Sequence, residues 1–157
     1  MQKTINHKIF FSQSPEEVWE YLTRPELIEL WLMKTDLQPT VGHQFQFWTK
    51  PMPSHDFDGN VYCTVLEVMP FQKLSYSWKG GPGDGRITLD SVVAWTLVPK
   101  DNGTELQLVH SGFKEMENLF MYTIMNDGWL KNMNKIVELI KMAKDGTTDI
   151  RPLPGDC

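Results

Sequence analysis

The segment SPEEVWEYLTRPELIELW, residues 14–31, contains two helix-start signals in succession. Ser14 is followed by Pro15 and, three residues after the serine, by Glu17, which is the pattern of a capping box with proline in the first turn. The stretch Thr-Arg-Pro-Glu at 23–26 repeats this arrangement. Two start signals so close together predict a bent pair of short helices, because a single straight helix would need only one.

Apolar and polar residues alternate on both sides of this helix pair. The alternation covers residues 5–11 before the pair and returns from Gln44 to Ser111 after it, in about five segments. The connections between these segments are short, and one of them, PKDNG at 99–103, is typical of a tight turn. We therefore expect antiparallel strands that lie beside one another in a sheet.

The apolar period becomes helical from about Lys114 to Asp145. The residues that form one apolar stripe at this spacing are Tyr122, Met125, Trp129, Met133, Ile136, Ile140 and Ala143. Gly128 interrupts the stripe at a cost of about 0.5–1 kcal/mol relative to alanine, so we expect a close approach, a kink or a helix start at Asn126 or Asp127. The order β-α-α-β-β-β-β-β-α predicts an α+β fold, in which a curved antiparallel sheet wraps around the long C-terminal helix.

Length and composition predict one domain over residues 1–145, followed by a mobile tail at 146–157. The formal net charge is −5 and Lys and Arg form no run, so neither nucleic acid nor a membrane is an expected partner. The N-terminus lacks the apolar region of a signal peptide, and no segment is long and apolar enough to span a bilayer. Cys63 and Cys157 do not suggest a disulfide framework, and we expect a cytoplasmic location.

No catalytic residue, metal site or cofactor is assigned from the sequence. The stretch KGGPGDGR at 79–86 lacks the spacing of a phosphate-binding loop, and we interpret it as a hairpin turn. The histidines, at positions 7, 43, 55 and 110, lack the paired spacing of metal ligands. A nucleophile assembled from distant residues stays open, although neither cysteine lies in an activating context.

The aromatic content indicates a cavity. Six Trp and nine Met in a chain of this length provide much bulky apolar surface. We expect the inward rings of the strands to face the last helix and to leave a lined pocket, the alternative being a solid core. The residues expected to line this pocket are Trp31, Phe45, Phe47, Tyr76, Trp78, Trp95, His110, Phe113, Met125, Trp129 and Met133.

The most informative member of this set is His110, in the segment GTELQLVHSGF at 103–113. Alternation places His110 on the same apolar face as Leu106 and Leu108, near the end of the strand. We predict that it lies at the cavity wall and contacts a ligand. The alternative is a core histidine that is hydrogen-bonded to a neighbour.

Together these segments resemble the START-like (SRPBCC) superfamily, in particular the branch similar to the C-terminal domain of the activator of heat-shock protein 90 ATPase. The resemblance is carried by SPEEVWEYLTRPELIELW, VGHQFQF, VLEVMPFQKLSYSW, GTELQLVHSGF and the GW before a final amphipathic helix, and it extends from about Ile5 to Lys144. It implies a helix-grip fold with a deep cavity between the sheet and the last helix. The usual Gly-Gly before the second strand is Val41-Gly42 in this chain.

Three functions follow as hypotheses, because one fold serves many functions. The first is binding of a small hydrophobic or amphipathic molecule without covalent chemistry. The second is an enzyme of the cyclase or hydrolase type that uses His110 as a general base. The third is a chaperone partner that acts through its outer surface. A second titratable group beside His110 would favour the enzyme, and a large exposed apolar patch would favour the chaperone partner.

Overall fold

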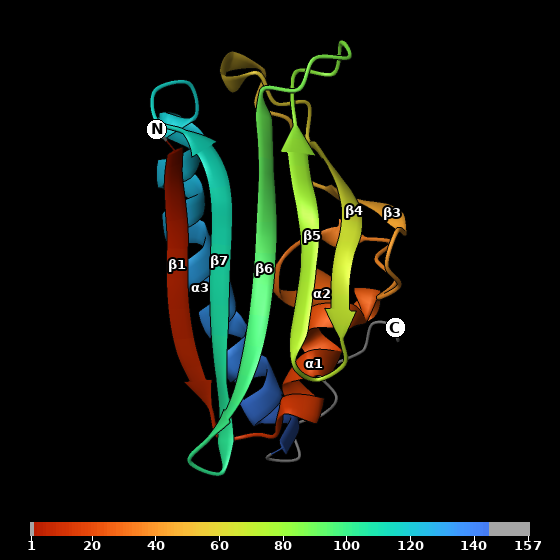
Figure 1. Cartoon of the computed structure of the whole chain (residues 1–157), viewed down its shortest axis with the longest axis vertical. Helices are drawn as coiled ribbons and strands as arrows, with labels where there is room; N and C mark the ends of the chain where they lie inside the picture. Colours follow the sequence, from red (N-terminus) through yellow and green to blue (C-terminus); the bar gives the residue numbers. More distant parts are fainter. Residues whose placement is uncertain (1, 145–157) are drawn as a thin grey trace.

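Seven strands and three helices are present in the computed structural model, which describes residues 2–144 (Figure 1). The predicted mobile tail at 146–157 and Cys157 lie outside the described residues. The strands are β1 (Gln2–Phe11), β2 (Lys34–Thr35), β3 (Gln44–Trp48), β4 (Asn60–Met69), β5 (Lys73–Gly80), β6 (Leu89–Lys100) and β7 (Gly103–Lys114). The helices are α1 (Pro15–Thr23), α2 (Pro25–Trp31) and α3 (Leu119–Lys144), with a short 3-10 helix, η1, at Pro53–His55.

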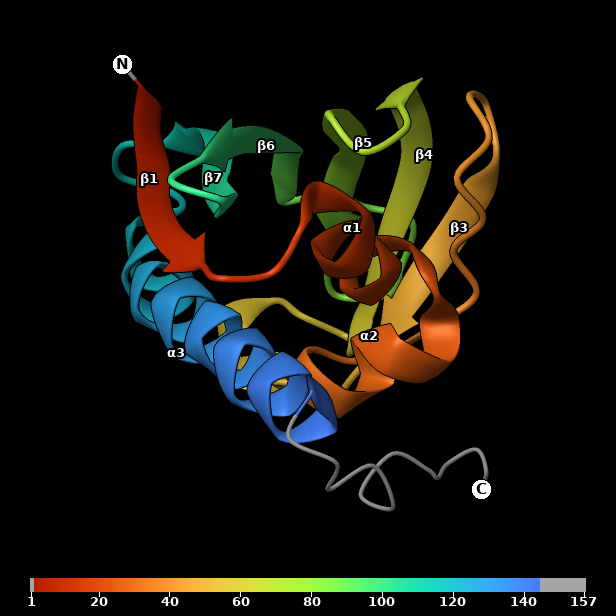
Figure 2. The same cartoon turned by 90° about the horizontal axis from the view of Figure 1, so that it is seen from below.

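The strands form one sheet in the order β1-β7-β6-β5-β4-β3-β2, with every neighbouring pair antiparallel. The sheet curves, and all three helices lie on its concave side, with α3 running across it (Figure 2). This arrangement confirms the predicted α+β helix-grip fold. β2 was not predicted, because a strand in which only Lys34 and Thr35 pair with β3 is too short to show alternation.

The helix pair α1–α2 follows from its start signals, with one correction. The Ser14 hydroxyl accepts a hydrogen bond from the Glu17 amide at 3.2 Å, and the Glu17 carboxylate accepts one from the Ser14 amide at 3.1 Å. Thr23, expected to open α2, is the last residue of α1, and Arg24 is the cap. The Thr23 hydroxyl donates to the carbonyl of Trp19 at 2.9 Å, so it is not available to cap the following helix.

The boundary between β7 and α3 lies later in the chain than predicted. β7 continues to Lys114, and α3 begins at Leu119. The side chain of Asn118 accepts a hydrogen bond from the Lys114 amide at 2.8 Å and donates one to the carbonyl of Thr88 at 2.9 Å. This buried amide satisfies the backbone of the turn, which is why residues 115–118 do not join the helix.

The apolar stripe of α3 faces the sheet as predicted. The buried members of the stripe are Trp129, Met133, Ile136 and Ile140, and those that are half-buried are Tyr122, Met125 and Ala143. A polar contact also joins α3 to the sheet, since Nε2 of His7 on β1 lies 2.8 Å from the carbonyl oxygen of Asn126. The core therefore lies between α3 and the concave face of the sheet.

Gly128 lies within α3, and two of the three reasons expected for it, a helix start and a close approach, do not apply. α3 runs through this position, so no helix starts at Asn126 or Asp127. A Cβ atom added to Gly128 would meet no heavy atom within 4 Å, which excludes a close approach as its reason. Neither a helix start nor a close approach therefore offsets the cost of a glycine at this position.

We expect Gly128→Ala to raise the free energy of unfolding by about 0.5–1 kcal/mol, because alanine restricts the unfolded chain and fits the open space. Urea denaturation of both proteins measures the change. The matched control is Gly112→Ala, which should destabilise the protein, because Gly112 has a φ of +108° and its Cβ would lie 2.9 Å from the carbonyl oxygen of Asp90. Destabilisation by Gly128→Ala would show that the glycine has a packing role.

Candidate functional site

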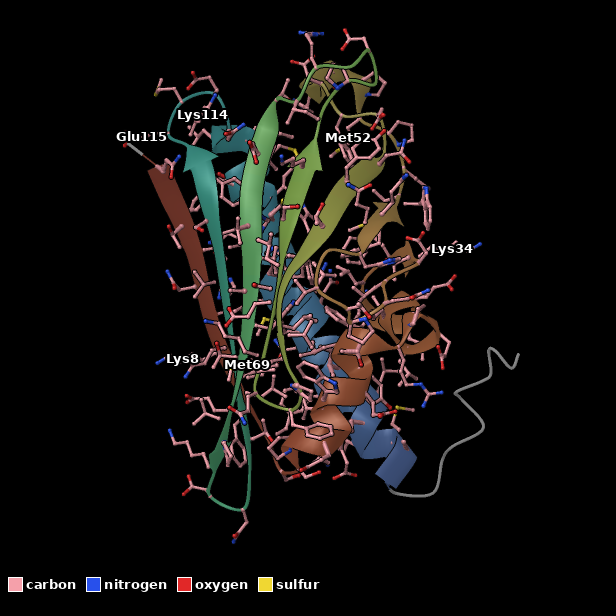
Figure 3. The ribbon with its side chains drawn as sticks, turned by 45° about the vertical axis from the view of Figure 1, so that its right-hand side comes forward. Lys8, Lys34, Met52, Met69, Lys114 and Glu115 are labelled. Carbon is pink, nitrogen blue, oxygen red and sulfur yellow. The ribbon has the colours of Figure 1, made fainter. Side chains whose placement is uncertain are left out.

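An apolar pocket of about 260 Å³ lies where the end of β5 and the first half of α3 meet the segment at 49–58. We call residues 49–58 the strap. The apolar lining residues are Leu32, Met33, Met52, Phe57, Val61, Trp78, Leu89, Met121, Ile124 and Met125, and the polar ones are Thr49, His55, Asp56, Thr88 and Asn132, together with Gly80. Met52 lies at the same end of the molecule as Lys114 and Glu115, far from Met69 (Figure 3).

The strap is held in a defined shape by its own backbone. The amide of Met52 donates to the carbonyl of Phe57 at 2.8 Å, and the amide of Phe57 donates back to the carbonyl of Met52 at 3.2 Å. The residues between them form η1, and Asp56 adopts the left-handed conformation with a φ of 57°. The strap is also attached to α3, because the rings of His55 and Phe120 stack with centroids 3.6 Å apart. The Met52–Phe57 backbone pair places the buried Phe57 at the pocket wall.

Trp78 of β5 joins the pocket to the aromatic core behind it. Its ring borders the pocket and packs against Trp129 of α3, with centroids 5.3 Å apart, and against Phe47 of β3 at 5.1 Å. Trp129 in turn contacts the edge of Trp95, and Trp95 contacts that of Trp31. These indoles meet at steep angles, which is a favourable geometry for aromatic rings.

His110 is fully buried behind Trp78 and has a hydrogen-bond partner on each ring nitrogen. The indole Nε1 of Trp129 donates to Nδ1 of His110 at 2.9 Å. Because Nδ1 accepts, Nε2 carries the proton, and it lies 2.9 Å from the hydroxyl oxygen of Ser91. That hydroxyl donates to the backbone carbonyl of Trp78 at 2.7 Å. We call this chain of three hydrogen bonds the relay.

Burial lowers the pKa of His110 from 6.5 to about 3. The ring is therefore neutral at physiological pH. Both of its nitrogens already have partners inside the protein, so it has no free lone pair with which to take a proton from a substrate. Its surroundings are those of a core histidine, and no Asp or Glu side chain is among its hydrogen-bond partners within residues 2–144.

The eleven predicted lining residues occupy three different places. Trp78 and Met125 border the pocket, and Phe45 borders a separate, more polar hollow at β3, β4 and β5. The others pack in the core away from the pocket lining: Trp31, Phe47, Tyr76, Trp95, His110, Phe113, Trp129 and Met133. The reason is that the large rings fill the space between the sheet and α3 edge to face.

Sequence reasoning missed most residues that line the pocket. The stretch SHDFDG at 54–59, which contains Phe57, has the composition of a polar loop, and Met52 lies just before it. The available signal was the pair of large apolar residues on either side of Pro-Ser-His-Asp, because a solvated loop seldom needs them. Leu32 and Met33, directly after the helix pair, gave a similar signal.

The described residues offer little for other chemistry. Burial raises the pKa of the Cys63 thiol, which disfavours the reactive thiolate form. Between residues 2 and 144, no group of three or more His, Cys, Asp or Glu side chains is placed to hold a metal ion. None of the helices in this part of the chain combines the length and the hydropathy needed to cross a membrane.

The family model described as "Activator of Hsp90 ATPase homolog 1-like protein" matches residues 12–141. The chain belongs to this family. No curated protein matches it significantly. The family is part of the START-like superfamily that the sequence resembles, and the helix-grip arrangement agrees with it.

Solved structures support the same fold over nearly the whole chain. Protein MLL2253 from Mesorhizobium loti is 36% identical, with a TM-score of 0.78, and the match covers 88% of this chain and 97% of that one. Protein BH1534 from Bacillus halodurans is 27% identical, with a TM-score of 0.69 and coverages of 88% and 96%. A structure described as the Aha1 dimer from Colwellia psychrerythraea is 18% identical, with a TM-score of 0.72 and coverages of 90% and 98%, which shows the fold alone.

We expect His110→Leu to lower the free energy of unfolding by about 1–3 kcal/mol, because it leaves the buried indole N–H of Trp129 without an acceptor. Denaturant midpoints measure the loss. In a Trp129→Phe background the same substitution should cost clearly less, since no indole donor is left unpaired. Equal costs in the two backgrounds would show that the Trp129–His110 hydrogen bond does not stabilise the fold.

The relay also predicts a pH dependence of stability. The unfolded chain protonates His110 near pH 6.5, whereas the folded protein resists protonation down to about pH 3, so acid favours unfolding over this range. Between about pH 7 and pH 5 the wild type should lose about 2 kcal/mol that His110→Leu does not lose. Urea titrations of both proteins at the two pH values test this. If wild type and His110→Leu lose the same free energy of unfolding between these pH values, folding does not lower the pKa of His110.

Proposed function

We propose that this protein binds one small apolar or amphipathic molecule in the pocket beneath the strap. The observation that carries this proposal is the composition of the wall, in which apolar side chains from several segments face a few polar groups. Ligand sites in proteins have this composition, with polar groups that fix the orientation of the ligand. A site that served only packing would be filled.

The volume limits the size of the ligand. An engineered apolar cavity of about 150 Å³ holds benzene, so a pocket of 260 Å³ has room for about ten non-hydrogen atoms by simple scaling. A fused bicyclic ring or a short branched chain would fill it. A longer molecule would have to extend past the strap or past the rim formed by Ile124.

The enzymatic alternative finds little support at His110. The ring is neutral, fully buried, and hydrogen-bonded on both nitrogens. Each of those bonds would have to break before the ring could accept a substrate proton. Binding without covalent chemistry needs no such rearrangement.

A chaperone partner is a second candidate, favoured by the family description and by one surface feature. Exposed apolar side chains gather before and within the first turns of α3: Met116, Leu119, Phe120 and Ile124. Such a patch suits contact with another protein. It also adjoins the pocket, because Ile124 and Met121 belong to the pocket wall, so the same patch suits the entry of an apolar ligand.

The binding proposal predicts saturable, one-site binding of 2-naphthylmethanol, a neutral fused-ring probe of suitable size. Isothermal titration calorimetry should show a negative heat-capacity change, because apolar surface is buried. Val61→Phe, which adds bulk at the pocket wall, should weaken binding at least tenfold. The control is Leu66→Phe on the outward face of the same strand, which should bind like the wild type.

Two results would contradict the binding proposal. One is the absence of any binding heat at millimolar probe. The other is equal weakening by Val61→Phe and Leu66→Phe, which would place the probe outside this pocket.

A further inference from the structure

We propose that the ligand of this pocket is a neutral or cationic planar aromatic molecule whose polar head donates hydrogen bonds, and that carboxylates are rejected. This inference rests on the binding function proposed above and specifies its ligand class. It is carried by the charges and the side-chain types of the pocket wall.

Among residues 2–144 the pocket lining offers an anionic ligand no Lys or Arg, and its one basic side chain is that of His55. The lining has one carboxylate, that of Asp56. The basic residues of the adjoining segments, Lys50 and Arg86, do not border the pocket, and Arg86 is paired with Asp84 at 2.9 Å. A carboxylate that entered this site would lose water, gain no counter-charge and lie near Asp56.

Asp56 is positioned by its backbone and leaves its side chain available. Its amide donates to the carbonyl of Pro53 at 3.2 Å, and its carbonyl lies 3.4 Å from the hydroxyl of Thr88. Among residues 2–144 the Asp56 carboxylate has no hydrogen-bond or ion-pair partner. The side chain of Asp56 is exposed to solvent, so a ligand head that carries N–H or O–H groups would replace water at this carboxylate.

The remaining wall favours a flat ring as the body of the ligand. Four methionines line the pocket, at positions 33, 52, 121 and 125, together with two aromatic rings, Phe57 and Trp78, and four aliphatic side chains. Methionine sulfur makes favourable contacts with aromatic rings, and its flexible side chain adapts to their outline. The neutral side chains of Asn132, Thr49 and Thr88 can accept or donate further hydrogen bonds without adding charge.

The test uses three probes that share one ring system and differ only in the head. These are 2-naphthylmethylamine, which is cationic, 2-naphthylmethanol, which is neutral, and 2-naphthoate, which is anionic. Calorimetry is carried out at low and at high salt. At low salt the amine should bind at least fivefold more tightly than the alcohol. The naphthoate should bind at least tenfold more weakly than the alcohol. Salt should weaken only the amine.

Asp56→Asn removes the charge and suits the left-handed backbone, since asparagine tolerates positive φ. It should reduce the affinity for the amine to that for the alcohol and leave the affinity for the alcohol within twofold. The matched control is Asp84→Asn, which removes an exposed carboxylate that does not border the pocket. This control should bind all three probes like the wild type.

The outcomes separate this inference from the binding function on which it rests. If naphthoate binds as tightly as the alcohol, or if Asp56→Asn leaves the preference for the amine unchanged, the ligand class is wrong and the binding function stands. If no probe binds, or if Val61→Phe fails to weaken binding, the binding function fails and the ligand class fails with it.

Discussion

The fold depends on the placement of polar atoms inside a core that is otherwise built from large rings. The indole N–H of Trp129 cannot be buried without an acceptor, and His110 provides one. The opposite nitrogen of the same imidazole then needs a partner of its own, which is the hydroxyl of Ser91. That hydroxyl in turn donates a hydrogen bond to the carbonyl of Trp78 on β5. A histidine on the inner face of β7 thus links α3, β6 and β5 through hydrogen bonds in a region from which water is excluded.

Because this polar chain is satisfied internally, the aromatic rings around it can pack without leaving a cavity. Trp95 shows the same solution, since its indole donates to the hydroxyl of Tyr76 at 3.0 Å. These rings fill the middle of the core, and the apolar pocket lies at one end, under the strap. The pocket has a rigid floor at Trp78 and a wall made of flexible methionines. In the proposed function, the rigid ring of Trp78 would select the shape of the part of the ligand that it touches. The flexible methionines would tolerate variation in the rest of the ligand.

Local sequence signals predicted the elements well and the site poorly. The capping box at Ser14 and the stripe of α3 are periodic or local features, which a single sequence displays directly. Alternation also predicted that His110 points inward. Its partner could not be predicted, because Ser91 meets it only through the β6–β7 register in which Val93 pairs with His110. The pocket wall combines segments from 32 to 132 in the sequence, and no local pattern reports that three-dimensional arrangement.

The attachment of the strap bears on how quickly a bound molecule can leave. The strap closes on itself through the Met52–Phe57 pair, and it is held to the neighbouring loop by the amide of Asp58, which donates to the carbonyl of Gly81 at 2.8 Å. Its ring contact with α3 is the stack of His55 on Phe120, and a contact between two rings is worth about 0.5–1.5 kcal/mol. Opening the strap would also expose Phe57, which is buried against the core. A ligand of the proposed kind would therefore leave through the opening of a loop that is held at several points, and its exchange would be slower than the nanoseconds to microseconds of a free loop.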